Sequence, residues 1–313
     1  MNDKIRVLFM GTPEFSVPCL EALIKSGYDV VGAVTQPDKP KGRGHKLIPT
    51  PVKACAAEHG IEVFQPETLK NEALKPVLER TEPDIIIVVA YGKILPEYIL
   101  SFPRLGCINV HASLLPRYRG AGPIQWSVIN GESVTGVTTM YMERGLDTGD
   151  MILKKKTPIG ENETSGELHD RLSLMGAELL IKTVEEIING TAPREKQDDS
   201  LSCYAPMIDR ETGHIDWSKP KNEILNLIRG VNPWPMSYSN YCGEPMKIIS
   251  AHAGGNADGV EGEIILADKN GITVVCGGKE SVVITEIQMK GGKRMHVASY
   301  LNGHTIEAGT VLE

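Results

Sequence analysis

The chain has 313 residues and a formal net charge of −7, so its surface as a whole lacks the strong positive charge typical of nucleic-acid-binding proteins. Hydrophobic residues make up 41%, enough for a sizeable core, and the length favours two domains over one. The cysteines are scattered without CxxC spacing, which predicts reduced thiols and argues against zinc sites and disulfide frameworks. There is no signal-peptide pattern and no apolar run long enough to span a bilayer, so we expect a cytoplasmic protein without a membrane partner.

The first part of the chain alternates short apolar runs with helical patterns. We expect strands over 4–11, 29–36, 62–65 and 84–91, and helices over 14–26, 50–59 and 71–80. This alternation predicts a doubly wound, mostly parallel α/β sheet that is covered on both faces. Such folds bind ligands at the carboxyl ends of their strands. Residues 9–15, 88–95 and 109–116 lie at the ends of three predicted strands, the third of which opens the stretch 106–125. We therefore expect these residues to converge.

The first turn does not match the common nucleotide-binding fingerprints. GTPEFS follows the first predicted strand and places Pro13 and Phe15 where GxGxxG has glycines. Because those glycines let the backbone approach a pyrophosphate, NAD or FAD binding is not expected. A GxxxxGK[ST] motif is also absent, so nothing in the sequence indicates a P-loop.

Residues 36–53 form a basic segment that is too polar and too rich in Pro and Gly for regular structure. Five basic residues stand there against Asp38 alone, which gives a local net charge of +4. The segment is either a solvated surface loop or a contact for phosphates. We favour the second interpretation because long irregular loops in compact domains are often functional.

The middle of the chain predicts an edge strand, a long helix and a break. In MILKKKTPI (151–159) the three lysines are typical of edge-strand protection. Residues 165–189 have the apolar spacing of an amphipathic helix, on which His169 and Asp170 read as a surface or interface pair. The polar stretch 190–207 has no periodicity and is interpreted as a linker. We therefore expect a catalytic domain over 1–189 and a second domain over 208–313.

The second predicted domain begins with a helical pattern that ends near residue 230 and continues with short β-rich runs. These lie at 246–253, 262–267, 271–278, 281–289 and in a last segment near 296–312. Five short strands with turn signals predict a small closed β-barrel of the OB type. Its net charge is −3, yet Lys290, Lys293, Arg294 and His296 cluster on one predicted hairpin. That hairpin is either a solvated turn or an RNA contact, since OB-folds often bind oligonucleotides through such loops.

Catalytic chemistry is indicated by GCINVHASLLPRYRGAGPIQ (106–125) and LDTGD (146–150). Strand alternation points Asn109 and His111 to one face. Formyl transfer to an amine needs a proton acceptor and a donor for the developing oxyanion, roles that His and Asn can fill while a carboxylate orients the His. We hypothesise that Asn109, His111 and Asp147 act together without a metal or a covalent intermediate. Whether His111 or Asp147 accepts the amine proton stays open.

The alternatives are structural roles: His111 would be a hydrogen-bonded core histidine, and Asp147 would be an ordinary turn residue. The Asn two residues before the His, and the Asp-Thr-Gly turn downstream, favour the catalytic interpretation. Ser113 does not stand in a GxSxG elbow, so a serine nucleophile is not expected. Cys107 reads as a small core residue.

The motif NVHASLLPRYRGAGPIQ followed by LDTGD resembles the signature of the tetrahydrofolate-dependent formyltransferases, and the resemblance extends over essentially the whole chain. It implies a Rossmann-like catalytic domain, 10-formyltetrahydrofolate as formyl donor, and Asn109, His111 and Asp147 as the catalytic residues. It also implies a folate-binding segment that consists of Ser113, Leu114, Leu115 and Pro116. The backbone of Ala90, Tyr91, Gly92 and Ile94 is implied to line the pterin pocket.

Within that family, MGTPEFSVP, QPDKPKGRGHKLIPTPVK, VVAYGKILP and RGVNPWPMSY are similar to members that formylate methionyl initiator tRNA for translation initiation. This similarity implies that the 38–48 loop enters the tRNA acceptor stem, with Arg43 as its key residue, and that Phe15 lies near the methionine side chain. The candidate tRNA contacts are Phe15, Lys41, Arg43, Lys46, Lys290, Lys293 and Arg294. We expect a monomer.

Two competing functions stay open. One is a formyltransferase for an amino-sugar nucleotide or for glycinamide ribonucleotide, because these enzymes share the NxH…SLLP…D pattern. The other is a non-catalytic RNA-binding protein with a retired catalytic domain. The basic loop at 36–53 favours tRNA over a small acceptor, and an intact Asn-His-Asp set argues against a retired enzyme.

Overall fold

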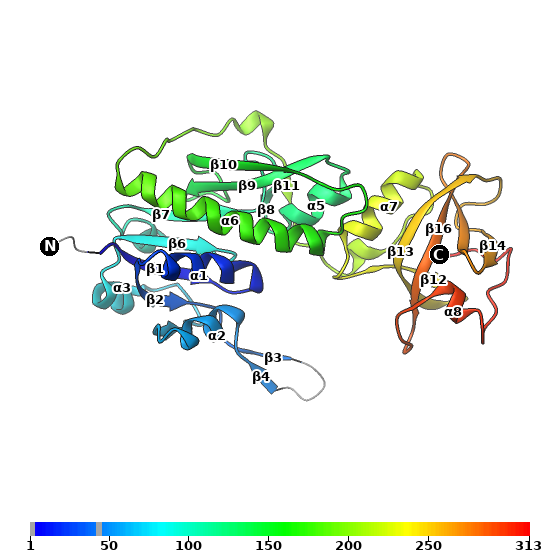
Figure 1. Cartoon of the computed structure of the whole chain (residues 1–313), viewed down its shortest axis with the longest axis horizontal. Coiled ribbons are helices and arrows are strands. Elements are labelled where there is room, and N and C mark those ends of the chain that lie inside the picture. The colour runs from blue at the N-terminus through cyan, green and yellow to red at the C-terminus, as the bar shows by residue number, and fades with distance from the viewer. Residues whose placement is uncertain (1–3, 42–45) are drawn as a thin grey trace. The chain divides into compact units, whose positions relative to one another are not determined.

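The computed structural model describes residues 4–41 and 46–313, and the chain divides into two compact units (Figure 1). The first unit consists of the residues up to Gly120 together with Thr135–Thr157 and His169–Tyr204. The second consists of Ala121–Val134, Pro158–Leu168 and Ala205–Glu313. Within the described residues, no helix has both the length and the apolar character needed to cross a membrane.

The first unit is built on a seven-stranded sheet in the order β10-β9-β7-β6-β1-β2-β5. Its strands are β1 (Arg6–Gly11), β2 (Asp29–Val34), β5 (Val63–Phe64), β6 (Ile85–Val89), β7 (Cys107–His111), β9 (Val134–Tyr141) and β10 (Met151–Pro158). The ladders that join β5, β2, β1, β6 and β7 are parallel, and β9 runs antiparallel to β7. This arrangement confirms the predicted mostly parallel sheet and places the lysine-rich β10 at an edge.

Helices cover both faces of this sheet. They are η1 (Glu14–Ser16), α1 (Val17–Lys25), α2 (Pro51–Glu58), α3 (Lys75–Thr81), α4 (Glu97–Leu100) and α6 (Ser165–Ile188). In Figure 1, α1 and α6 run in front of the strands. Gly176 allows α6 to approach β7, since a Cβ there would lie 3.1 Å from Val110 Cγ1. On the other face, Leu8 and Ile86 pack with Leu78 of α3 and with α4 in one apolar cluster.

The prediction that residues 36–53 lack regular structure is wrong for a short hairpin. Strands β3 (Lys39–Lys41) and β4 (Lys46–Ile48) pair in antiparallel register. A two-stranded ladder is closed by backbone groups, so it forms without an apolar side-chain pattern. Directly before β3 in the sequence, the Asp38 carboxylate accepts hydrogen bonds from Lys53 Nζ at 2.5 Å and from Gln65 Nε2 at 2.7 Å.

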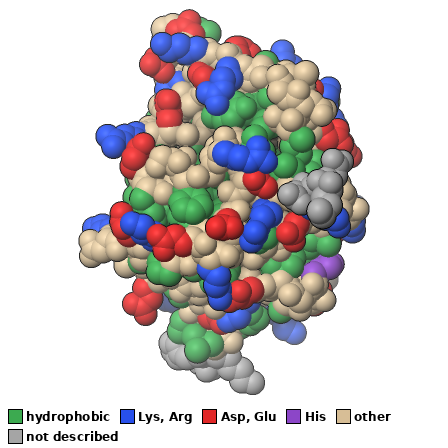
Figure 2. All heavy atoms as spheres, turned by 90° about the vertical axis from the view of Figure 1, so that its left-hand side faces the viewer, with side chains coloured by type: hydrophobic (Ala, Val, Ile, Leu, Met, Phe, Trp, Pro, Cys, Tyr) green, Lys and Arg blue, Asp and Glu red, His purple; other side chains and the backbone are tan. Residues whose placement is uncertain are grey.

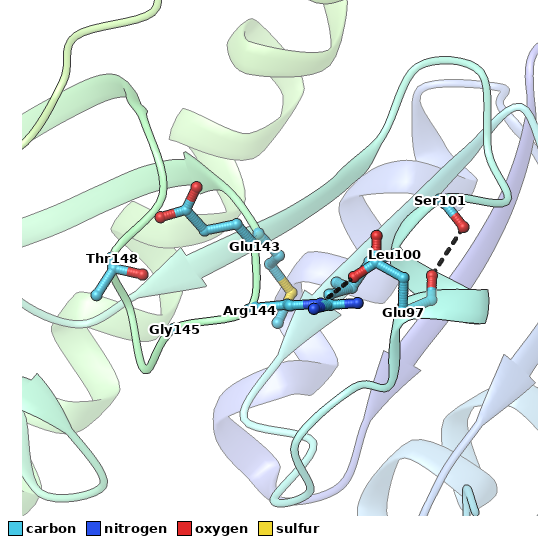
Figure 3. A pocket seen from close by; sticks show the side chains of 8 residues that line it. Glu97, Leu100, Ser101, Glu143, Arg144, Gly145 and Thr148 are labelled. Carbon is cyan, nitrogen blue, oxygen red and sulfur yellow. Dashed lines mark hydrogen bonds and ion pairs between the residues drawn. The ribbon is translucent and has the colours of Figure 1, made fainter.

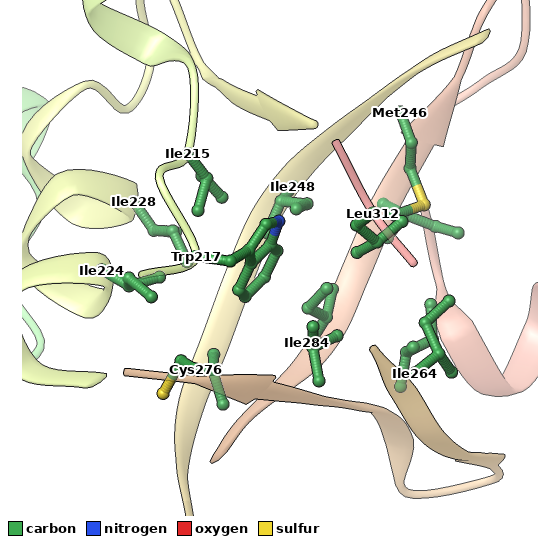
Figure 4. Packing of buried hydrophobic residues seen from close by; sticks show 14 of the residues in the cluster. Ile215, Trp217, Ile224, Ile228, Met246, Ile248, Ile264, Cys276, Ile284 and Leu312 are labelled. Carbon is green, nitrogen blue, oxygen red and sulfur yellow. The ribbon is translucent and has the colours of Figure 1, made fainter. Parts of the chain in front are cut away.

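The second unit contains α5 (Pro123–Ile129), α7 (Lys221–Gly230) and an antiparallel sheet in the order β12-β13-β16-β15-β14, with β17 paired to β16. The strands are β12 (Ser237–Tyr241), β13 (Glu244–Asn256), β14 (Ile264–Asp268), β15 (Gly271–Cys276), β16 (Glu280–Met289) and β17 (Met295–His296). Trp217, Ile224 and Ile228 pack against the sheet in one buried core (Figure 4). A separate β-rich unit was therefore predicted correctly.

Two details of the second unit differ from the sequence-based expectation. Strand β12 was not foreseen, because SYSNY has little apolar character even though Ser237 and Ser239 are buried. The last predicted strand region holds only β17 before the short helix α8 (Val297–Tyr300) begins. The remaining short helices of the chain are η2 (Asp199–Leu201) and η3 (Glu211–Gly213).

Candidate active site

Strand β7 lies between two neighbours and brings its polar residues into the interior. Asn109 is opposite Val88 of β6 and Met140 of β9, and His111 is opposite Thr138 of β9. The alternation of a strand points Asn109 and His111 to the same face. Both side chains are buried. They are thus the polar end of an otherwise apolar strand, as the sequence predicted.

Asp147 reaches these two residues from the loop between β9 and β10. Asn109 Nδ2 donates to Asp147 Oδ1 at 3.3 Å, and His111 Nδ1 lies 3.7 Å from Asp147 Oδ2. The backbone N–H of Gly120 also donates to Asp147 Oδ2 at 2.9 Å. The structure therefore brings the predicted Asn-His-Asp set together, with the carboxylate fixed by donors from two other segments.

The hydrogen bonds of His111 identify its exchangeable nitrogen. His111 Nε2 lies 2.8 Å from the carbonyl oxygen of Tyr118. A carbonyl oxygen can only accept, so Nε2 must carry a proton in both the neutral and the charged ring. Nδ1 is therefore the atom at which His111 gains or loses a proton, and it faces Asp147. The separation of 3.7 Å from Asp147 Oδ2 is longer than a direct hydrogen bond.

The local sequence LDTGD fits the loop that presents Asp147. Asp147 has φ +54°, a left-handed conformation that Asp adopts more readily than most residues but that still costs on the order of 1 kcal/mol. Gly149 allows a close approach, since a Cβ there would lie 1.9 Å from the carbonyl oxygen of Tyr141. The loop thus depends on surrounding contacts to keep its conformation.

The segment Ser113–Pro116 is tied to β9. Ser113 Oγ donates to the carbonyl of Arg117 at 2.6 Å, and Thr138 Oγ1 donates to the carbonyl of Ser113 at 2.7 Å. The same Thr138 oxygen accepts from the N–H of Leu115 at 3.1 Å. Ser113 and Leu115 are buried, whereas Leu114 and Pro116 are partly exposed. The segment is therefore a fixed ledge beside His111.

The segments that follow β1 and β6 meet, as expected from the topology. Ser16 Oγ donates to the carbonyl of Val89 at 2.6 Å, and Thr12 Oγ1 donates to the carbonyl of Tyr91 at 3.1 Å. Tyr91 is buried, whereas Ala90, Gly92 and Ile94 are exposed. The predicted pterin-lining segment is thus anchored through the buried Tyr91, and its other residues are accessible to solvent.

A cavity of about 490 Å³ lies on the loop that carries Asp147 (Figure 3). Its wall includes Gly145 and Thr148, which flank Asp147 in sequence, but none of the three predicted catalytic residues. Across it, Arg144 Nε pairs with Glu97 Oε2 at 2.8 Å. The cavity is large enough for a ring-sized part of a ligand and is bordered by charged groups.

Phe15 and His169 form a separate contact on the same unit. The Phe15 ring is buried, and its centroid lies 5.2 Å from that of His169 in an edge-on arrangement. His169 Nδ1 is 2.9 Å from Asp170 Oδ1. The prediction that His169 and Asp170 form a surface pair is confirmed, although the histidine ring also covers Phe15.

The predicted tRNA contacts lie in two places. Lys41 and Lys46 are the terminal residues of β3 and β4, whereas Arg43 lies outside the described residues. In the second unit, Lys290 Nζ pairs with Glu244 at 2.7 Å and Arg294 binds Glu286 through two bonds of 2.6 and 2.7 Å. Figure 2 shows acidic and basic side chains interspersed over the face that it displays. On this face, positive charge does not form a broad field.

Cys107 is a core residue and not a nucleophile. Its thiol donates to the carbonyl of Ile99, and burial raises the pKa of Cys107 to about 12. A thiol with that pKa holds almost no thiolate at neutral pH. All six cysteines are free thiols, as predicted.

Comparison with known proteins decides the family. Residues 3–184 match the family model described as "Formyl transferase", and residues 207–305 match "Formyl transferase, C-terminal domain". The chain belongs to the formyl transferase family. A methionyl-tRNA formyltransferase of Alkaliphilus oremlandii is 53% identical over 98% of this formyl transferase and 99% of the relative. Another, from Geotalea uraniireducens, is 49% identical over 98% of both chains.

Solved structures confirm the fold. The N-formyltransferase of Helicobacter canadensis, determined with folinic acid and dTDP-3-aminofucose, superposes with a TM-score of 0.68 at 21% identity. The match covers 90% of this formyl transferase and 98% of that chain. HypX of Aquifex aeolicus with tetrahydrofolic acid gives a TM-score of 0.62 at 16% identity, over 96% of this chain and 47% of that one.

Sequence reasoning missed the groups that hold Asn109, His111 and Asp147 in place. Tyr118 accepts from His111 and Gly120 donates to Asp147, both through the backbone, so side-chain chemistry gave no signal. The RYRG sequence directly after SLLP contains both residues, and it could have indicated that this loop contacts the site. Gln197 also contacts the Asp147 loop, but it lies in the stretch that the sequence predicts as a linker.

Proposed function

We propose that this formyl transferase moves the formyl group of 10-formyltetrahydrofolate to the α-amine of methionyl initiator tRNA. The products are formylmethionyl-tRNA for translation initiation and tetrahydrofolate. The observation that carries the reaction type is the cluster that the buried Asn109 and His111 at the end of β7 form with the half-buried Asp147. The acceptor is supported by the relatives named methionyl-tRNA formyltransferase, which match almost the entire chain.

In the proposed reaction the amine nitrogen attacks the formyl carbon, and the carbonyl oxygen becomes an oxyanion. Asn109 gives one amide N–H to Asp147, so its second N–H is available to the oxyanion. Neutral His111 has a lone pair at Nδ1 and accepts the proton that the amine loses. The charged ring then lies beside the Asp147 carboxylate, which stabilises it. When the bond from the formyl carbon to N10 of the folate breaks, the charged His111 ring releases a proton and N10 takes one up, which restores the neutral ring.

We propose the donor site from two hydrogen-bonded segments and one cavity near this cluster. Ser113–Pro116 forms the ledge beside His111, and the backbone of residues 90–94 forms a second wall. The cavity of about 490 Å³ on the Asp147 loop supports placing part of the donor there. Both walls are held by hydrogen bonds, which favours a preformed site.

The tRNA site is proposed for the basic segment 36–53, and more weakly for the 289–296 hairpin. Phosphate contact is local, so a net charge of −7 does not oppose it. We place the methionine side chain near Phe15. We further propose a cytoplasmic monomer, with the catalytic domain over 1–189, a linker over 190–207 and the tRNA-binding domain over 208–313.

The proposal is tested by incubating the protein with labelled 10-formyltetrahydrofolate and each acceptor in turn. Methionyl initiator tRNA should be formylated, whereas glycinamide ribonucleotide and amino-sugar nucleotides should not. Uncharged initiator tRNA, which lacks the amine, is the control. Transfer to a small acceptor but not to methionyl-tRNA would overturn the proposed acceptor, and transfer to none would overturn the activity.

A further inference from the structure

The stretch that follows α6 returns to the active site. Residues 195–203, here called the strap, begin beside β10, where Glu195 and Met151 exchange two backbone hydrogen bonds of 2.8 and 2.9 Å. The strap ends on the loop after Pro116. There, Arg119 N–H donates to the carbonyl of Cys203 at 3.0 Å, and Tyr118 N–H lies 3.2 Å from Cys203 Sγ. The strap therefore spans from the strand after Asp147 to the loop that bonds His111.

Gln197 contacts the Asp147 loop directly through its side chain. Its Nε2 donates to the carbonyls of Asp147 and Gly149, both at 2.8 Å. Its Oε1 accepts from Arg119 Nε at 3.0 Å and from Arg119 Nη2 at 2.8 Å. The side chain is 7% exposed, and both donors and both acceptor positions of its amide are used.

These contacts join the two loops that complete the catalytic cluster. Arg119 is directly followed by Gly120, whose N–H binds the Asp147 carboxylate, and directly preceded by Tyr118, whose carbonyl binds His111. On the other side, Gln197 holds the backbone of Asp147 in its left-handed conformation. One amide thus bridges the loop of Tyr118 and the loop of Asp147, in addition to the direct bond from Gly120 to the Asp147 carboxylate.

We propose that Gln197 is a positioning residue for Asp147 in formyl transfer. This inference rests on the proposed catalytic role of Asp147. Gln197 is not expected to touch either substrate, so its loss should lower kcat and leave substrate binding nearly intact. Because a misplacement of about 1 Å can reduce a rate about 10²-fold, we expect a fall in kcat of about 10- to 100-fold.

The test uses Gln197→Glu, which keeps the shape and the pairing with Arg119 but loses both N–H donors to the Asp147 loop. Gln197→Met keeps the length and removes all four bonds, and it provides a second variant if the first folds poorly. The matched control is Asp199→Ala, which removes only the outer partner of Arg119, whose ion pair to Asp199 is 2.8 Å long. For each variant, kcat and both KM values are measured with 10-formyltetrahydrofolate and methionyl-tRNA, and folding is followed by circular dichroism and thermal unfolding.

The expected result is a loss of kcat in both Gln197 variants, with KM values within about threefold of the original and Asp199→Ala within about twofold in all parameters. Turnover of Gln197→Glu within twofold of the original would overturn the inference, as would a loss that matches the fraction of unfolded protein or that lies in KM alone. Asp147→Asn separates the two proposals. If it stays fully active, the proposed role of Asp147 fails; if it is inactive while Gln197→Glu is normal, only the positioning role fails.

Discussion

The proposed catalytic cluster of Asn109, His111 and Asp147 and the 289–296 hairpin are both polar, but they are held in opposite ways. Asn109 bonds Asp147 across 38 residues of chain, and Gly120 bonds it across 27. On the hairpin, Arg294 bonds Glu286, which is 8 residues away, and the arginine side chain is 54% exposed. The first cluster is assembled by the tertiary fold, whereas the second is a local surface pairing.

This difference shows what each cluster can do. Bond formation in the catalytic step depends steeply on distance and angle, so its groups need buried partners that fix them. Binding a phosphate backbone depends on the sum of several solvated charges, each of which adds little and is screened by salt. Single substitutions should therefore have large effects on turnover in the first cluster and small effects on binding in the second.

The largest effects are expected at Asn109 and His111. Asn109→Ala should lower kcat by about 10²–10³-fold because one oxyanion donor is lost. His111→Ala should lower it by about 10²–10⁴-fold because proton transfer is lost. Steady-state formylation of methionyl-tRNA measures both, and circular dichroism should show a normal fold. Asn270→Ala, at an exposed asparagine bonded to Asp268, is the matched control. Full activity in either active-site variant would contradict the mechanism.

An intermediate effect is expected at Arg43. Arg43→Ala should weaken tRNA use about 10-fold and make binding less sensitive to salt, with the slope of log K against log salt reduced by about 1. Binding of 10-formyltetrahydrofolate should not change. Titration of tRNA at several salt concentrations measures the tRNA affinity, and calorimetry measures the affinity for the donor. A variant that binds tRNA normally but loses the donor would show that the basic segment is assigned wrongly.

Sequence patterns predicted the parts of the fold that depend on apolar spacing. The buried strands β1 and β6 and the long helix α6 were found within a few residues, because their burial dictates their composition. The hairpin of β3 and β4 and the strand β12 were missed, since their pairing does not depend on an apolar side-chain pattern. Asn109 and His111 stood out as polar residues ending a buried strand.

The groups that hold the proposed catalytic residues could not be predicted in the same way. Tyr118 and Gly120 act through backbone atoms, which every residue has. Gln197 lies 50 residues beyond Asp147 in a polar stretch without periodicity, and only the tertiary fold brings the two together. Composition identified this stretch as a break in the pattern, but composition does not show which part of the fold the stretch contacts.

The smallest effect is expected at Arg294, and it should fall on stability more than on tRNA. The Arg294 hydrogen bond holds the pKa of Glu286 below its usual range. A lowered folded-state pKa stabilises the protein above the unfolded pKa of about 4.3, and this contribution is lost as the pH falls through the folded value. Arg294→Ala should therefore reduce the free energy of unfolding by about 0.5–1 kcal/mol at pH 7, a small value because the arginine is largely solvated, and the reduction should shrink below about pH 4.

Lys293→Ala provides the comparison for that variant, because no ion pair is found for Lys293 within the part of the chain that the structure describes. It should leave the free energy of unfolding unchanged at every pH. If the hairpin contacts tRNA, Lys293→Ala weakens binding at least as much as Arg294→Ala does, since Arg294 is already engaged by Glu286. Urea unfolding at pH 7 and pH 3.5, with tRNA binding at low salt, tests both. Unchanged stability together with a large loss of tRNA binding in Arg294→Ala alone would show that its pairing with Glu286 opens to bind phosphate, and the contrast between fixed and solvated clusters would fail at this site.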